Sequence, residues 1–403
     1  MVSPMRDASS ASQAPQEQPL ATLNLPFYLC SLILNANSCE FLELDGVPDP
    51  KLLRQALQAA VGRHPSLNSR IRRRGLRAFW QRTNKDEPIE LHWHDLSSAD
   101  AATLHQHFLH NIWGPGQALD LHQQRAARFH LTVTRDGSVL QLITTHVWSD
   151  ARAGYRLSHE ICQAYSALHA GQAPAESEIS VPVRNSEHLL RESLAGREGD
   201  YRSAALRALA HEINTPATGL SVPPGRGPND FCKVDLGAEF LTRLRQAARR
   251  RGVTVHALIT AALVLACRDH DRAQGIHEPR LHQIHDLFSM RKLGHGGEPG
   301  CTDDLYDTMV LPFDVNFDTA LSSDALIGEA MAKLEKLKSG GIFVEYFKIA
   351  LLVKLLSFLP KRWGIPWAVR NFLTGNVMCT NPGPVPYAID ALAPHYSKET
   401  LEF

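Results

Sequence analysis

The stretch ITTHVWSDARAG, residues 143–154, joins the end of an alternating apolar run to the start of a helical pattern. The residues before it, SVLQL, alternate as a half-buried strand does, and apolar residues recur at helical spacing from Tyr155 to Leu168. We therefore expect a strand that leads directly into a helix, with His146 at the strand end and Asp150 in the first helical turn.

These two side chains suggest an acid–base site. The free amides at a helix N-terminus favour a carboxylate, so Asp150 is expected to be ionised and fixed. An imidazole has an unperturbed pKa of about 6.5, so His146 suits proton abstraction from an alcohol, amine or thiol near neutral pH. The alternative is a strand-end histidine with only a structural hydrogen bond. The spacing alone leaves both interpretations open.

Composition limits the classes of function. A chain of 403 residues is long for one core, which favours two domains or one double domain. Lys+Arg and Asp+Glu number 42 each, so no nucleic-acid partner is expected. The seven cysteines are scattered and form no Cys-x-x-Cys pair, which indicates a reducing, cytoplasmic setting.

The chain divides by composition. Residues 1–20 are predicted to be a disordered tail, and residues 216–230 a Pro/Gly-rich linker between subdomains at 21–215 and 231–403. Strand and helix patterns alternate on both sides of the linker, which predicts the α/β class. The segments at 69–81 and 88–97 are expected to be strands.

The most apolar helix, at 341–360, contains three charged residues, and no stretch is long enough to span a membrane. We expect this helix to form core or tunnel wall, with an interfacial helix that touches a membrane as the alternative.

Several motifs resemble those of the CoA-dependent acyltransferase superfamily, which includes chloramphenicol acetyltransferase and condensation domains. THVWSDA, at residues 145–151, is similar to its His-His-x-x-x-Asp-Gly signature. The segments at 52–71 and 241–266, HDLFSMRK at 285–292 and MCTNPGP at 378–384 match further family segments in the same order. The resemblance covers roughly residues 25–385.

The resemblance implies two chloramphenicol-acetyltransferase-like subdomains, each a mixed sheet with helices, and an active-site tunnel at their interface. It implies that His146 is the general base, with Thr145 in place of the first histidine. Asp150 would be chiefly structural, paired with Arg291. Thr145 and Trp148 would line the tunnel, as would two residues of a late loop that we expect to supply oxyanion donors, Thr380 and Asn381.

The implied reaction transfers an acyl group to an alcohol or amine acceptor, with ester or amide product left open. The donor would be acyl-CoA or a phosphopantetheinyl thioester on an acyl carrier protein, and no resident cofactor is expected. We expect a role in secondary or lipid metabolism.

The sequence departs from the family pattern in three ways. Ala151 replaces the usual glycine, no Asp-Phe-Gly-Trp-Gly segment is present, and the chain ends about twenty residues after the late loop, which suggests a shortened C-terminus or a divergent branch. These departures favour the alternative of a non-catalytic condensation-like protein that binds a carrier, peptide or lipid.

Histidines outside the motif suggest a second site. His92 and His94 share one strand face, and His105, His107 and His110 follow on a helix. Because few carboxylates or cysteines accompany them, we expect solvated surface histidines and no metal.

Overall fold

The structure of the 403-residue chain is a computed structural model. It describes residues 17–32, 35–74, 77–84, 87–148, 150–174, 190, 193–194, 196–214, 230–289, 310–358, 377–380 and 399–402.

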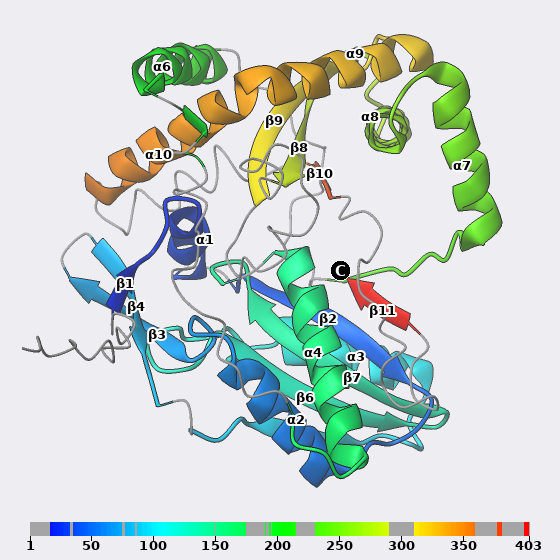
Figure 1. The fold of residues 1–403 in the computed structure, drawn as a ribbon. Helices are drawn as coiled ribbons and strands as arrows, with labels where there is room; N and C mark the ends of the chain where they lie inside the picture. Colours follow the sequence, from blue (N-terminus) through cyan, green and yellow to red (C-terminus); the bar gives the residue numbers. More distant parts are fainter. Residues whose placement is uncertain are drawn as a thin grey trace, which may run out of the picture.

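The N-terminal half is built on a five-stranded sheet with the order β11-β2-β7-β6-β5. Its strands are β2 (Asn37–Leu44), β5 (Leu91–Asp95), β6 (Ala127–Thr134), β7 (Gly137–Thr145) and β11 (Glu399–Glu402). Helices α2 (Pro50–Gly62) and α4 (Ala151–His169) lie side by side on one face, and α3 (Ala101–Trp113) lies on the other (Figure 1). β5 and β6 are parallel, and the other neighbours are antiparallel, so the sheet is mixed.

A smaller antiparallel sheet, β1-β4-β3, flanks this half. Its strands are β1 (Glu17–Pro19), β3 (Ser69–Arg74) and β4 (Arg77–Arg82). The segment 69–81, which was expected to be a strand, therefore holds parts of two antiparallel strands, which pair from Ser69 with Arg82 to Arg74 with Arg77. Residues 17–19, expected in the disordered tail, pair with β4.

The C-terminal half has a three-stranded sheet, β10-β8-β9, partly covered by helices (Figure 1). The strands are β8 (Leu281–Ser289), β9 (Val310–Asp318) and β10 (Val377–Cys379). The helices are α6 (Glu198–Asn214), α7 (Gly237–Arg251), α8 (Val255–Ala273), α9 (Ser323–Lys336) and α10 (Ile342–Phe358), with the π-helical turn η2 (Leu337–Gly341) between the last two. The predicted α/β class is confirmed.

Two hydrophobic cores follow these halves, but their membership differs from the expected boundaries. Leu23, just before α1 (Asn24–Ser31), packs in the second core although it precedes the first sheet. Leu190, Leu194 and, on α6, Ala205 also join that core, although the sequence placed them in the N-terminal subdomain. In the opposite direction, β11 crosses to pair with β2 (Figure 1). The two halves are therefore interlocked at three points.

Helix α10 is the apolar helix predicted at 341–360. Ile342, Phe347 and Val353 are buried, and Lys348 pairs with Glu345 at 2.6 Å between Nζ and Oε2, so much of this helix lies in the core. Among the described helices, none taken singly is long and apolar enough to cross a membrane. Only α7 and α8 meet that criterion together, as a pair bent by 101°.

Candidate active site

The candidate site is the turn between β7 and α4. His146 is exposed, whereas the neighbours described on both sides, Thr145, Val147 and Trp148, are at most 2% exposed. The predicted strand and helix are both present, and the turn between them carries one exposed imidazole among buried residues. The ring of Phe27 in α1 lies 5.4 Å from the His146 ring, centroid to centroid. An accessible imidazole fixed in this way is suited to proton transfer.

Buried hydrogen bonds hold this turn. Asn24 of α1, fully buried, donates from Nδ2 to the Val147 carbonyl at 2.7 Å. The Trp148 amide donates to the Thr145 carbonyl at 2.9 Å, and the Val147 amide donates to Thr145 Oγ1 at 3.3 Å. Because buried polar groups are costly to leave unpaired, these bonds restrict the backbone on either side of His146.

Asp150 is the N-cap of α4. Its carboxylate accepts a hydrogen bond from the Ala153 amide at 3.0 Å, and the residue is 5% exposed. This is the cap geometry expected for an aspartate before a helix. Ala151, in place of the family glycine, is the first residue of α4. Arg291, the predicted ion-pair partner of Asp150, lies outside the described residues, so this ion pair stays a prediction.

The other predicted site residues have different surroundings. Trp148 is 1% exposed, belongs to the N-terminal core and donates from Nε1 to Ser66 Oγ at 2.7 Å. Thr145, at 2% exposed, is also buried, so neither side chain is accessible as a tunnel lining in this structure. Thr380 directly follows β10 and is exposed. Asn381 lies outside the described residues.

The helix after the motif is tied to the turn that follows α2. Glu160, on α4 and 5% exposed, contacts His64 Nε2 at 2.6 Å and accepts from Arg156 Nε at 3.0 Å. Arg63 Nη1 lies 3.5 Å from the same carboxylate. Burial lowers the pKa of His64, while Glu160 acts in the opposite direction. His64 also meets the Trp148 ring edge to face, with centroids 6.2 Å apart.

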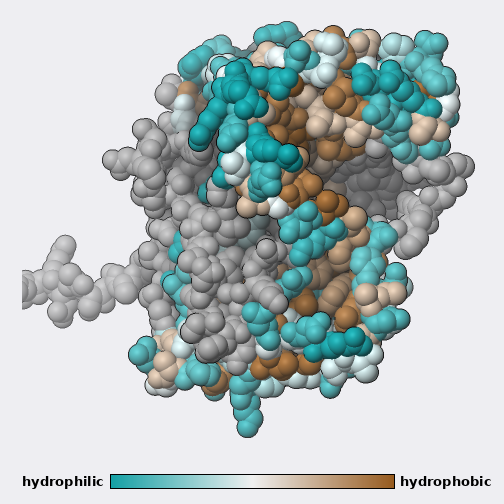
Figure 2. Space-filling view, turned by 90° about the vertical axis from the view of Figure 1, so that its right-hand side faces the viewer, coloured by the Kyte–Doolittle hydropathy of each residue, from teal (hydrophilic) through white to brown (hydrophobic). Residues whose placement is uncertain are grey.

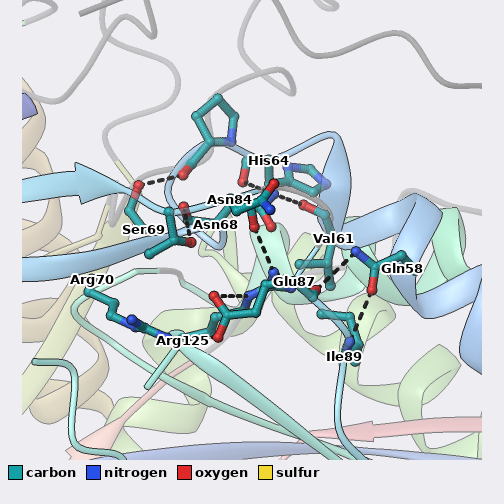
Figure 3. Close-up of polar contacts among 12 residues, drawn as sticks. Gln58, Val61, His64, Asn68, Ser69, Arg70, Asn84, Glu87, Ile89 and Arg125 are labelled. Atoms are coloured by element: carbon teal, nitrogen blue, oxygen red, sulfur yellow. Dashed lines mark hydrogen bonds and ion pairs between the residues drawn. The ribbon is translucent and has the colours of Figure 1, made fainter. Parts of the chain in front are cut away.

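The turn that carries His64 is itself fixed by polar contacts (Figure 3). Asn68 donates from Nδ2 to the carbonyls of Val61 and His64 at 2.7 and 3.1 Å. Nearby, Glu87 accepts from Arg70 Nη2 at 2.7 Å, and its carbonyl accepts from Arg125 Nη2 at 2.6 Å. This turn, Arg63-His64-Pro65, lies in the segment 52–71 that resembles the family, and it supports the motif from outside it.

A close approach of α4 to β2 completes the support. Gly154 lies against the buried carboxylate of Glu40, where a Cβ would overlap Oε1. Glu40 Oε2 accepts from Ser158 Oγ at 3.0 Å. This glycine comes three residues after the position where the family signature has its own.

The histidines outside the motif form a cluster on β5, β6 and α3. His94 Nε2 lies 3.1 Å from His130 Nδ1, the His92 ring stacks on His130, and His107 contacts His94 edge to face. Burial, with smaller contributions from neighbouring positive groups, lowers the pKa of His130 to about 3 and that of His107 to about 4. His105 instead pairs with Asp230 at 2.7 Å. His92, His94 and His107 are half-buried, contrary to the expectation of solvated surface histidines. His130, which the sequence analysis did not single out, is buried.

A second group of side chains was missed by the sequence analysis. His256 of α8, Asp286 of β8 and Cys379 of β10 bring their N, O and S atoms within 4.8 Å of one another. They are separated by 30 and 93 positions, and no short motif connects them. The parallel pairing of β10 with β8 brings Cys379 to Asp286, and the packing of α8 against β8 adds His256.

An apolar cleft of about 500 Å³ lies away from the motif, between α7 and α8. Its lining includes Leu241, Leu244, Val255 and Ile259. Helix α7 lies on the side of the molecule that Figure 2 presents, where apolar side chains gather between polar ones. Because no motif residue lines this cleft, it is not part of the candidate acid–base site.

The arrangement of elements is that of condensation domains. The first condensation domain of the calcium-dependent antibiotic synthetase, solved with a substrate analogue, gives a TM-score of 0.67 at 14% identity, with 96% of this chain and 85% of that one covered. The starter condensation domain of rhizomide synthetase, solved with C8-CoA, gives a TM-score of 0.61 at 14% identity, with 90% of this chain and 77% of that one covered. Polyketide synthase associated protein 5 from Mycobacterium tuberculosis gives a TM-score of 0.59 at 14% identity, with 96% of this chain and 86% of that one covered. The predicted fold of two chloramphenicol-acetyltransferase-like subdomains is confirmed.

The sequence identifies the family. The condensation domain model matches residues 37–271, more than half of the chain, and the chain belongs to that family. A probable nonribosomal peptide synthetase of Salinispora arenicola, CymA, is 26% identical over 298 residues, which is 68% of this chain. The chain spans 4% of the length of that relative. The resemblance drawn from the motifs to the wider acyltransferase superfamily is therefore confirmed.

Proposed function

We propose that this chain is a condensation-type acyltransferase with His146 as its general base. The observation that carries the proposal is the exposure of His146 in a turn whose other described residues are buried. A general base has to be reachable by substrate and held in one place. The hydrogen bonds to Val147 and from Trp148 supply the second condition.

The reaction breaks a thioester C–S bond and forms a C–O or C–N bond. His146 takes the proton of the acceptor hydroxyl or amine as the oxygen or nitrogen attacks the carbonyl carbon. The electron pair of the C–S bond leaves with sulfur, and His146 returns the proton to that thiolate. General base catalysis of this kind contributes typically about 10²–10⁴-fold. No covalent intermediate with the protein is needed.

Asp150 fixes the position of the His146 turn and does not contact substrate. Its carboxylate caps α4 at the Ala153 amide, and the helix begins at the next residue, Ala151, five residues after His146. Substituting an N-cap aspartate by alanine costs about 1 kcal/mol. Arg291 is proposed as its cationic partner, and Thr380 with Asn381 as donors to the oxyanion.

The donor is proposed to be an acyl-CoA or an acyl carrier protein thioester. One solved relative of the fold was crystallised with C8-CoA, and the relative CymA is a peptide synthetase. Both observations belong to those proteins, and they define the donor classes to be tested here.

The experiment offers the full chain a panel of acyl-CoAs and acyl carrier protein thioesters with mixed alcohols and amines, and detects products by mass spectrometry. Product formation by the wild type but not by folded His146→Ala supports the proposal. Tight binding of an acyl carrier protein with no turnover of any donor would instead support the non-catalytic alternative, which Ala151 favours.

A further inference from the structure

Three elements of the C-terminal half converge on one group of possible metal ligands, which we call the His256 cluster: His256, Asp286 and Cys379. Asp286 and Cys379 are direct partners in the parallel pairing of β8 with β10, so they occupy matching positions on adjacent strands. His256 is the second residue of α8, which packs against this sheet. The cluster is separate from the His146 turn in sequence and in fold elements.

The geometry suits a single small cation. The three ligand atoms lie within 4.8 Å of one another, and His256 Nε2 is 2.8 Å from Asp286 Oδ2. Bonds of about 2.0–2.3 Å in a tetrahedral zinc site place ligand atoms about 3.3–3.7 Å apart. Small side-chain movements therefore bring all three atoms to bonding distance of one ion.

The site is shielded and its carboxylate is oriented. Asp286 and Cys379 are 2% and 4% exposed, and the His256 side chain is 18% exposed. The Leu287 amide donates to Asp286 Oδ1 at 3.1 Å, and Thr260, one helical turn beyond His256, has its hydroxyl 3.5 Å from Oδ2. Such outer contacts orient metal ligands and are typical of built sites.

The donor set selects the class of ion. One sulfur, one imidazole nitrogen and one carboxylate oxygen suit a borderline ion such as Zn²⁺ or Co²⁺, and not the all-oxygen preference of Mg²⁺ or Ca²⁺. A thiolate and a carboxylate together neutralise a divalent charge. Binding releases the Cys379 thiol proton to solvent as the sulfur–metal bond forms.

We propose that the His256 cluster binds a zinc-class divalent cation through three protein ligands and leaves a fourth position open. Three protein ligands with one free position are the pattern of accessible zinc sites, whereas closed structural sites use four. The residue after Cys379 is the exposed Thr380, so the site adjoins the loop assigned to the oxyanion. This proposal does not depend on the acyltransferase assignment.

Cobalt spectroscopy tests the site directly. The full chain is stripped with a chelator, kept reduced and titrated with Co²⁺ alone. We expect one equivalent to produce visible d–d bands and a near-ultraviolet thiolate-to-cobalt band, both removed by one equivalent of Zn²⁺. Cys379→Ser should abolish the thiolate band, and His256→Gln should weaken binding at least about tenfold.

Two matched variants serve as controls. Cys232→Ser removes an exposed cysteine, and His277→Ala removes an exposed histidine after α8, so both should leave the bands unchanged. Circular dichroism checks each fold, and His256→Gln alone decides the result if Cys379→Ser unfolds. The proposal is overturned by the absence of a band, by a thiolate band that survives Cys379→Ser, by a His256→Gln protein that binds cobalt as tightly as wild type, or by cobalt binding without thiolate character.

Discussion

At the scale of single residues, Gly154 shows how closely α4 approaches β2. No side chain fits at this position without displacing Glu40, whose carboxylate is buried and bonded to Ser158. The residue lies in the first turn of the helix that Asp150 caps. The placement of the His146 turn therefore depends on the absence of one methyl group.

We predict that Gly154→Ala lowers the free energy of unfolding by about 1–3 kcal/mol, because overpacking forces Glu40 from its buried position. Urea denaturation measures the change. Gly328→Ala is the matched control, since that exposed glycine of α9 has open space around it. Because alanine favours a helix over glycine, this substitution should raise the free energy of unfolding by about 0.5–1 kcal/mol. Combining Gly154→Ala with Glu40→Ala should recover part of the loss. Equal stability of Gly154→Ala and wild type would contradict the packing account.

The buried histidines predict a pH dependence. The pKa of His130 is lowered to about 3 and that of His107 to about 4, so the unfolded chain binds protons first as pH falls. The contribution of these two histidines to stability is fully present above about pH 6.5 and is lost as pH falls from there, to about 4 for His107 and about 3 for His130. At pH 5 we expect each of the two histidines to lower the free energy of unfolding by about 1 kcal/mol, after allowance for solvent screening.

Urea midpoints at pH 7.5 and pH 5 measure this loss. His130→Phe keeps a ring in the core and should lose less stability between these pH values than the wild type does. An equal loss in both proteins would mean that His130 is not a source of the acid sensitivity.

At the scale of elements, the contact between α2 and α4 is held by Glu160. This carboxylate, in the middle of α4, meets His64 and Arg156 and lies beside Arg63, in the turn after α2. His64 in turn contacts Trp148. A chain of contacts therefore runs from the turn after α2 to the residue two positions beyond His146.

We expect Glu160→Gln to reduce the free energy of unfolding by about 3 kcal/mol, because it removes the charge shared by two arginines and a buried histidine. Chemical denaturation provides the measurement. The control Glu335→Gln, at an exposed position of α9, should change stability by no more than about 0.5 kcal/mol. Similar effects of the two substitutions would refute a special role for Glu160.

Local patterns in the sequence were sufficient to predict β7 and α4. The alternation before His146 and the helical spacing after Asp150 predicted β7 and α4. The structure adds a turn at His146 between the two elements and places Asp150 at the N-cap, one residue before the helix. Trp148 shows the limit of such patterns, because a residue inside a motif gives no sign of whether it faces the core or a tunnel. The His256 cluster shows the same limit, since its ligands meet only through tertiary contacts: the pairing of β10 with β8 and the packing of α8 on β8.

At the scale of the whole molecule, the two halves are interlocked by exchanged segments. β11 joins the N-terminal sheet after the chain has built the second core, while Leu23 and α6 pack on the other side of the predicted boundary. Composition marks a linker but does not say which core an element joins, so the sequence boundaries at 215 and 231 missed this exchange.

The crossing strand predicts a measurable coupling. In a chain that lacks residues 399–403, β2 becomes an edge of its sheet, and we expect its outward amides to exchange with deuterium at least about tenfold faster. Peptides from β8 and β9 provide the internal reference, because their pairing does not involve β11. Unchanged protection of residues 37–44 would show that β11 does not pair with β2 in solution.

The most direct test of the central claim is the single-turnover rate of acyl transfer by His146→Ala, with the donor and acceptor that the panel identifies. Because the proposed base is the only group changed, we predict a rate at least about 10²-fold below wild type, with circular dichroism and urea midpoint unaltered. The control His277→Ala should react at the wild-type rate. A folded His146→Ala protein that transfers the acyl group as fast as wild type would contradict the assignment of His146 as the base.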